Sequence, residues 1–75
     1  MKKYKIRTFR GYSYKGTLDA AEQEAKDMIM DIIVDAQPKA HWWAEVVRCD
    51  DNEQVLFIRC PELWKWDYLR KIKTV

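Results

Sequence analysis

The chain has 75 residues, with fourteen lysine and arginine residues against twelve acidic residues and a formal net charge of +2. This length predicts a single compact domain over residues 1–75. The mixture of helix and strand patterns along the chain makes it an α+β domain. The near balance of charge excludes an extended acidic mimic of DNA and falls short of a strongly basic nucleic-acid binder. Four tryptophans, four tyrosines and two phenylalanines are more than one small core can bury, so some should lie on a binding surface.

The N-terminal segment predicts a strand over residues 3–10, followed by a loop over residues 11–16. The strand alternates between an apolar side and a cationic side. The cationic side comprises Lys3, Lys5, Arg7 and Phe9. The loop is bracketed by glycines, and its Tyr12 and Tyr14 are candidates for contact with a partner.

The stretch from Thr17 to Ala36 predicts a long helix. Thr17 is suited to the N-cap position, and Pro38 stops the helix because the residue before a proline is disfavoured in the α region. The apolar residues recur with the three-then-four spacing of one helical face. They are Leu18, Ala21, Ala25, Met28, Ile29, Ile32, Ile33 and Ala36.

An acidic ridge lies opposite this apolar stripe. Asp27, Asp31 and Asp35 are spaced four residues apart, with Met30 beside them. Like charges at this spacing are mildly destabilising in a helix. The ridge is therefore either a solvated helix face or a contact surface for a basic region of another protein.

Residues 41–49 and 54–60 predict a β-hairpin whose turn places Asn52 in the left-handed region. One face should be core; its members are Trp43, Glu45, Val47, Leu56, Ile58 and Cys60. The other should face outward; its members are Trp42, Ala44, Val46, Arg48, Val55, Phe57 and Arg59. A slip of one residue would exchange the two faces of a strand.

A short C-terminal helix is predicted from Pro61 to Lys71, although residues 64–68 also alternate as a strand would. The predicted order of elements is thus β-α-β-β-(α). It corresponds to a three-stranded, mostly antiparallel sheet in the order 1-3-2, packed on one long helix. The sheet face away from the helix should be basic and aromatic, unless the C-terminal segment folds over it.

No arrangement typical of catalysis is present. The two glycines fit no phosphate-binding loop, and Ser13 is the only serine. His41, Cys49 and Cys60 lack the spacing of a zinc site. We therefore expect a non-enzymatic protein without a metal or cofactor. A small ribonuclease toxin with His41 as general base is a second alternative.

The N-terminus carries no apolar signal segment, and no apolar run approaches the roughly 20 residues needed to span a bilayer. We therefore expect a cytoplasmic protein with reduced cysteines and no membrane association. If the gene is carried by a phage, the compartment is the cytoplasm of the host cell.

The organisation of the chain resembles that of small phage-encoded anti-CRISPR proteins. The likeness lies in a basic first strand (KYKIRTF), a capped helix (TLDAAEQEAKDMI), a hairpin (WWAEVVRCDDNEQVLFIRC) and an aromatic, basic tail. The resemblance implies a non-enzymatic inhibitor that binds a CRISPR effector or another nuclease complex and blocks its guide-RNA or target-DNA path. No family motif lines up with this chain, so no residue role is carried over.

The leading expectation is a small inhibitor, monomeric or homodimeric, that acts on a nucleic-acid-handling defence complex through protein–protein contact. Its expected contact residues are Tyr12, Tyr14, Asp27, Met30, Asp31, Asp35, Trp42 and Arg48. The alternative is a module that binds RNA or single-stranded DNA through the basic, aromatic sheet face. Its expected residues are Lys3, Lys5, Arg7, Phe9, Phe57 and Arg59.

Overall fold

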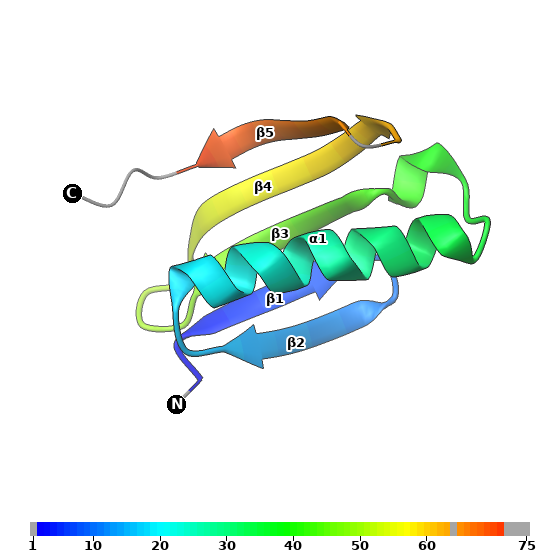
Figure 1. Cartoon of the computed structure of the whole chain (residues 1–75). Helices are drawn as coiled ribbons and strands as arrows, with labels where there is room; N and C mark the ends of the chain where they lie inside the picture. Colours follow the sequence, from blue (N-terminus) through cyan, green and yellow to red (C-terminus); the bar gives the residue numbers. More distant parts are fainter. Residues whose placement is uncertain (1, 64, 72–75) are drawn as a thin grey trace.

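The computed structural model describes residues 2–63 and 65–71, which form one antiparallel sheet and one long helix. The elements are β1 (Tyr4–Thr8), β2 (Gly11–Lys15), α1 (Leu18–Val34), the 3-10 helix η1 (Lys39–His41), β3 (Trp43–Arg48), β4 (Glu53–Glu62) and β5 (Lys65–Lys71). The strand order is β2-β1-β3-β4-β5, and α1 lies across one face of the sheet (Figure 1). Within the described residues, no helix is long and apolar enough to cross a membrane.

The predicted helix is confirmed, and its two ends have clear physical causes. At the start, the hydroxyl oxygen of Thr17 accepts a hydrogen bond from the backbone N–H of Ala20 at 3.2 Å. At the other end, Ala36 adopts a left-handed φ of 59°. Its N–H donates to the carbonyl of Ile33, and the N–H of Gln37 donates to that of Ile32. This pair of bonds is a Schellman motif. It ends α1 at Val34, before the chain reaches Pro38.

The connection through α1 explains how an antiparallel sheet is built around a helix. β2 and β3 each pair antiparallel with β1, so they run parallel to one another with β1 between them. α1 joins β2 to β3, which makes a split β-α-β unit. β4 and β5 then extend the sheet as consecutive antiparallel strands.

The core lies between α1 and the sheet. Two of the four buried helix residues are alanines, which lets α1 approach the strands closely. The buried apolar residues are Ile6, Ala21, Ala25, Ile29, Ile32, Ala44, Val46, Val55, Leu56, Ile58 and Cys60.

The predicted fold is wrong in strand number, strand order and C-terminal structure. The sheet has five strands in the order β2-β1-β3-β4-β5, where three in the order 1-3-2 were expected. Residues 11–15, expected in a loop, form β2 because they pair with β1 in unbroken register. A helix was expected from Pro61 to Lys71, but residues 61–62 complete β4 and residues 65–71 form β5. The strand at residues 43–48 lies beside β1, because β2 reverses the chain before α1.

The expected faces of β3 are also reversed. Ala44 and Val46 are fully buried, whereas Trp43, Glu45 and Val47 are only half-buried on the other side of the strand. The bulk of Trp43 favoured a core position in the sequence, but small side chains fit beneath the closely packed helix. The hairpin itself is present, and Asn52 in its turn has the expected left-handed φ of 57°.

Candidate functional site

The sheet face opposite α1 is covered by none of the described segments (Figure 1). We call it the open face. The register of the strands assigns to it Lys5, Arg7, Tyr12, Tyr14, Trp43, Glu45, Val47, Gln54, Phe57, Arg59, Asp67 and Arg70, and Leu69 lines a hollow on the same face. The C-terminal segment does not fold over it between residues 65 and 71. That segment joins the sheet edge as β5 and turns Tyr68 toward α1, where its hydroxyl donates to Glu22. Trp64 lies outside the described residues.

Two aromatic rings lie side by side at the end of the open face nearest η1. The rings of Trp43 on β3 and Phe57 on β4 are nearly parallel, with an angle of 11° and centroids 6.0 Å apart. They border a hollow of about 280 Å³. Its other lining residues include Lys39, Trp42, Arg59 and Leu69. The hollow therefore joins ring surfaces to two cationic side chains.

Tyr12 and Tyr14 on β2 form a second aromatic area. Their rings meet edge to face with centroids 5.8 Å apart, and 63% of Tyr12 is exposed. The ammonium group of Lys5 lies 4.6 Å from the centre of the Tyr12 ring, and that of Lys2 lies 4.8 Å from the centre of the Tyr14 ring. Cations over these rings hold positive charge at this end of the open face.

Ion pairs orient two arginines of the open face. Arg7 Nη2 lies 3.1 Å from Glu45 Oε1, and Arg59 Nε lies 2.9 Å from Asp67 Oδ2. A guanidinium has five N–H donors, so each arginine keeps donors for a further partner. Gln54 donates to the second oxygen of Glu45 at 2.6 Å. Arg7, Glu45 and Gln54 line a hollow of about 330 Å³, together with Lys5.

Charge is segregated between the two sides of the molecule. Six acidic residues lie between Asp19 and Asp35, on α1 or at its C-terminal cap. The open face instead carries four cations, Lys5, Arg7, Arg59 and Arg70, against Glu45 and Asp67. The side away from the helix is consequently the more basic one.

The structure divides the predicted acidic ridge. Asp27 and Asp31 are exposed on α1, with Asp27 accepting a hydrogen bond from Gln23 at 3.0 Å. Asp35 forms an ion pair with Arg10, so it is partly neutralised. Met30 is half-buried. All three aspartates are exposed, and the ion pair with Arg10 compensates the charge of Asp35.

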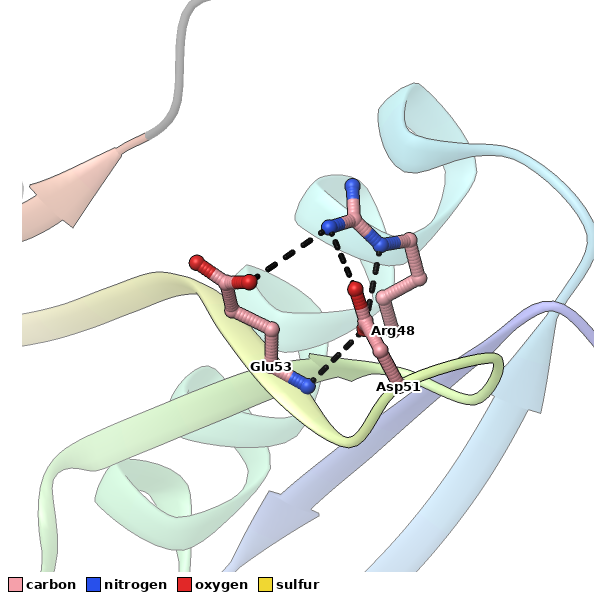
Figure 2. A network of polar contacts seen from close by, with 3 residues as sticks. All are labelled: Arg48, Asp51 and Glu53. Carbon is pink, nitrogen blue, oxygen red and sulfur yellow. Dashed lines mark hydrogen bonds and ion pairs between the residues drawn. The ribbon is translucent and has the colours of Figure 1, made fainter.

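Trp42 and Arg48, also predicted to contact a partner, have structural roles. Trp42 packs against the core, and its indole N–H donates to the carbonyl of Gln37 at 2.9 Å. Figure 2 shows Arg48 bound to Asp51 through two hydrogen bonds, of 3.2 and 2.8 Å, with Glu53 nearby. The Arg48 bonds lower the pKa of Asp51, and Asp51 in turn raises the pKa of Arg48. This network fixes the turn between β3 and β4.

The structure brings the residues predicted for nucleic-acid binding closer together than those predicted to contact a protein partner. Lys5, Arg7, Phe57 and Arg59 share the open face, and the exposed Lys3 precedes β1. Phe9 lies beyond the end of β1, where its ring stacks on His41 with centroids 3.7 Å apart. Sequence reasoning missed Trp43, Glu45, Asp67 and Leu69 as members of this face. The strand-like alternation of residues 64–68 was the signal that could have found Asp67.

The stacked position of His41 gives it a packing role beside Phe9. Cys49 is exposed and Cys60 is buried, and both are free. Among residues 2–63 and 65–71, no group of three or more potential metal ligands is found. The described side chains add nothing in favour of the ribonuclease alternative.

The chain matches no protein-family model, no curated protein and no solved structure.

A polar network on the helix side ties β5 to α1. The Tyr68 hydroxyl donates to Glu22 Oε2 at 2.8 Å, and Lys71 Nζ lies 3.1 Å from Glu22 Oε1. Burial tends to raise the pKa of Glu22, but the bonds from Tyr68 and Lys71, together with Lys26, lower it overall. Contact with Tyr68 raises the pKa of Lys26. Ionised Glu22 therefore stabilises the folded chain.

Tyr68→Phe is expected to reduce the free energy of unfolding at pH 7 by about 1 kcal/mol, because Glu22 loses a hydrogen bond. Since the folded-state pKa of Glu22 is lowered, its contribution is present above the ordinary value of 4.5 and is lost as the pH falls through the lowered value. The difference in the free energy of unfolding between Tyr68→Phe and the wild type should therefore be smaller at pH 3 than at pH 7. Urea denaturation at pH 7 and pH 3 measures this, with Tyr12→Phe as the matched control. A difference that is equal at both pH values would contradict the assignment.

Proposed function

We propose that the protein is a non-enzymatic module that binds RNA or single-stranded DNA through its open face. The observation that carries this proposal is the composition of that face, which interleaves aromatic rings with lysine and arginine on a sheet backed by α1. Bases of single strands stack on flat rings, while cations neutralise the phosphates. Both kinds of group are present within one continuous surface.

The aromatic groups supply the base-binding part of the proposal. Trp43 and Phe57 line the hollow of about 280 Å³, and Arg59 and Lys39 lie on the same hollow. A base placed there would meet rings, with cations beside its phosphate. Tyr12 offers a further exposed ring at the β2 edge of the sheet. The two aromatic areas lie at different strands, so a strand of several nucleotides suits the face better than one base.

Lys5 and Arg7 supply the phosphate-binding part. They are two residues apart on β1, so both project from the open face between the two aromatic areas. Arg7 is held by Glu45 in a defined orientation while keeping other donors. Six of the twelve acidic residues lie on α1 or at its C-terminal cap, and this favours approach of a polyanion from the sheet side.

The proposal predicts a salt dependence that identifies the contact residues. Fluorescence anisotropy with labelled single-stranded RNA and DNA should show affinity falling steeply with salt. Lys5→Ala and Arg7→Ala should each weaken binding and reduce the slope of log K against log salt by about 0.7. Lys15→Ala is the matched control, because Lys15 pairs with Glu24 on the helix side. Salt-insensitive binding, or an equal loss in the Lys15 variant, would sink the proposal.

A second candidate function is inhibition of a nucleic-acid-handling defence complex through protein–protein contact, as in the anti-CRISPR proteins that the chain resembles. The outer side of α1 favours it, because Asp27 and Asp31 are exposed there and 77% of Val34 is exposed. An acidic surface beside an exposed apolar side chain suits a basic surface on a nuclease. The contact would lie on the helix side of the molecule, opposite the open face.

Charge reversal tests this second candidate. Asp27→Lys combined with Asp31→Lys should abolish protection of a targeted phage in cells that carry a CRISPR system and express the protein. The same variant should bind oligonucleotides at least as well as the wild type, since its added charge is positive. Protection that survives the reversal would return these aspartates to the role of a solvated helix face.

A further inference from the structure

The two edges of the sheet differ in how open they are to a further strand. β5 departs from regular register with β4 at two places and carries Lys65, Arg70 and Lys71. β2 pairs with β1 in unbroken register over its five residues and contains no proline. Proteins usually block exposed sheet edges with bulges, proline or charged residues. β5 has such protection, whereas β2 has only Lys15.

The charge of Lys15 is compensated within its own chain. Its Nζ lies 3.6 Å from Glu24 Oε2, and the hydroxyl of Ser13 donates to the same oxygen at 3.0 Å. Both side chains therefore point toward α1. The edge of β2 presents backbone groups and two tyrosines, and the one charged side chain of β2 is paired with α1.

We propose that two copies of the chain pair antiparallel along β2 to form a homodimer. In a two-fold arrangement centred on Ser13, Tyr12 lies opposite the partner's Tyr14, and Gly11 lies opposite the partner's Lys15. The tyrosine pairs are cross-strand aromatic pairs, which stabilise antiparallel strands. Each lysine faces a glycine, so like charges do not oppose one another. The contact uses the same surface on both copies and closes at two.

The dimer would present one continuous sheet with both open faces on the same side. This follows because the two-fold axis that relates two antiparallel edge strands is perpendicular to the plane of the sheet. Rotation about that axis leaves both open faces on the same side. The dimer stands independently of nucleic-acid binding, because it rests on the β2 edge alone. If the open face does bind single strands, the dimer doubles the length of the site and raises its avidity.

Analytical ultracentrifugation of the full chain tests the proposal. The mass should rise with concentration from the 9.1 kDa monomer toward twice that value and no further. Tyr12→Lys combined with Tyr14→Lys opposes lysine to lysine in both pairs, which should weaken association at least tenfold. Tyr12→Glu combined with Tyr14→Glu should do the same. Leu69→Lys, which places a lysine at the β5 edge, is the control and should leave the dimer intact.

Mixing the lysine and glutamate variants should restore a dimer, because opposite charges then face each other across the pair. This restoration also shows that both variants are folded. A wild-type chain that stays monomeric at millimolar concentration would overturn the proposal. Loss of association in the Leu69 variant alone would overturn it too. Growth of the mass beyond the dimer would indicate pairing of β2 with β5 in open chains, which is equally incompatible with a closed dimer.

Discussion

Trp43→Ala is expected to weaken binding of single-stranded oligonucleotides by roughly 5- to 150-fold. Removing an aromatic ring from beneath a stacked base costs about 1–3 kcal/mol, and 1.4 kcal/mol corresponds to a factor of ten. Trp43 lies on the open face at the start of β3, beside Phe57, and lines the hollow with it. Fluorescence anisotropy at a fixed salt concentration measures the change in affinity.

Two controls separate stacking from other causes. Trp43→Phe keeps a flat ring and should retain most of the affinity. The salt slope of the alanine variant should match that of the wild type, because the phosphate contacts of Lys5 and Arg7 remain. A thermal melt establishes that the variant is folded. Equal loss in the alanine and phenylalanine variants, or no loss in either, would rule out stacking on this ring.

Ile29→Ala is expected to reduce the free energy of unfolding by about 2–5 kcal/mol, because the side chain is fully buried between α1 and the sheet. A core of this size rarely supplies more than roughly 3–5 kcal/mol of net stability. The variant should therefore be near or beyond the point of unfolding at room temperature. Urea denaturation followed by circular dichroism measures the effect.

Val34→Ala is the matched control for the core, because it shortens an aliphatic side chain on the same helix where 77% of the residue is exposed. Its effect should stay within about 0.5 kcal/mol. Similar stabilities for the two variants would mean that the inner side of α1 does not form the core.

The helix could be predicted because its signals are local. The spacing of its apolar residues and the capping of Thr17 are properties of neighbouring residues, and both are confirmed. The exact end could not be predicted, because Ala36 is an unusual residue for a left-handed position. Glycine is the residue that normally marks such an end.

The strands β2 and β5 could not be predicted because each depends on a partner elsewhere. Residues 11–15 lie between glycines and read as a loop, and only pairing with β1 makes them a strand. Pro61 suggested the start of a helix. It lies instead within β4, where the register with β5 is irregular and a missing N–H is tolerated.

Part of the open face followed from the sequence. Lys5 and Arg7 on β1, and Phe57 and Arg59 on β4, were predicted to share it, whereas Phe9 lies beyond the end of β1. Trp43 and Glu45 were assigned to the core, because β3 has apolar residues on both sides and alternation alone does not decide which side meets the helix. Leu69 was lost with the incorrect C-terminal helix.

An NMR titration shows directly whether the open face binds single-stranded RNA. Isotopically labelled protein would be titrated with single-stranded RNA while the backbone amide and indole N–H signals are followed. We expect the largest shifts at the indole of Trp43 and the amides of Lys5 and Arg7, with Asp27 and Asp31 on α1 unmoved. Shifts confined to α1, or no shifts at saturating RNA and low salt, would contradict the account.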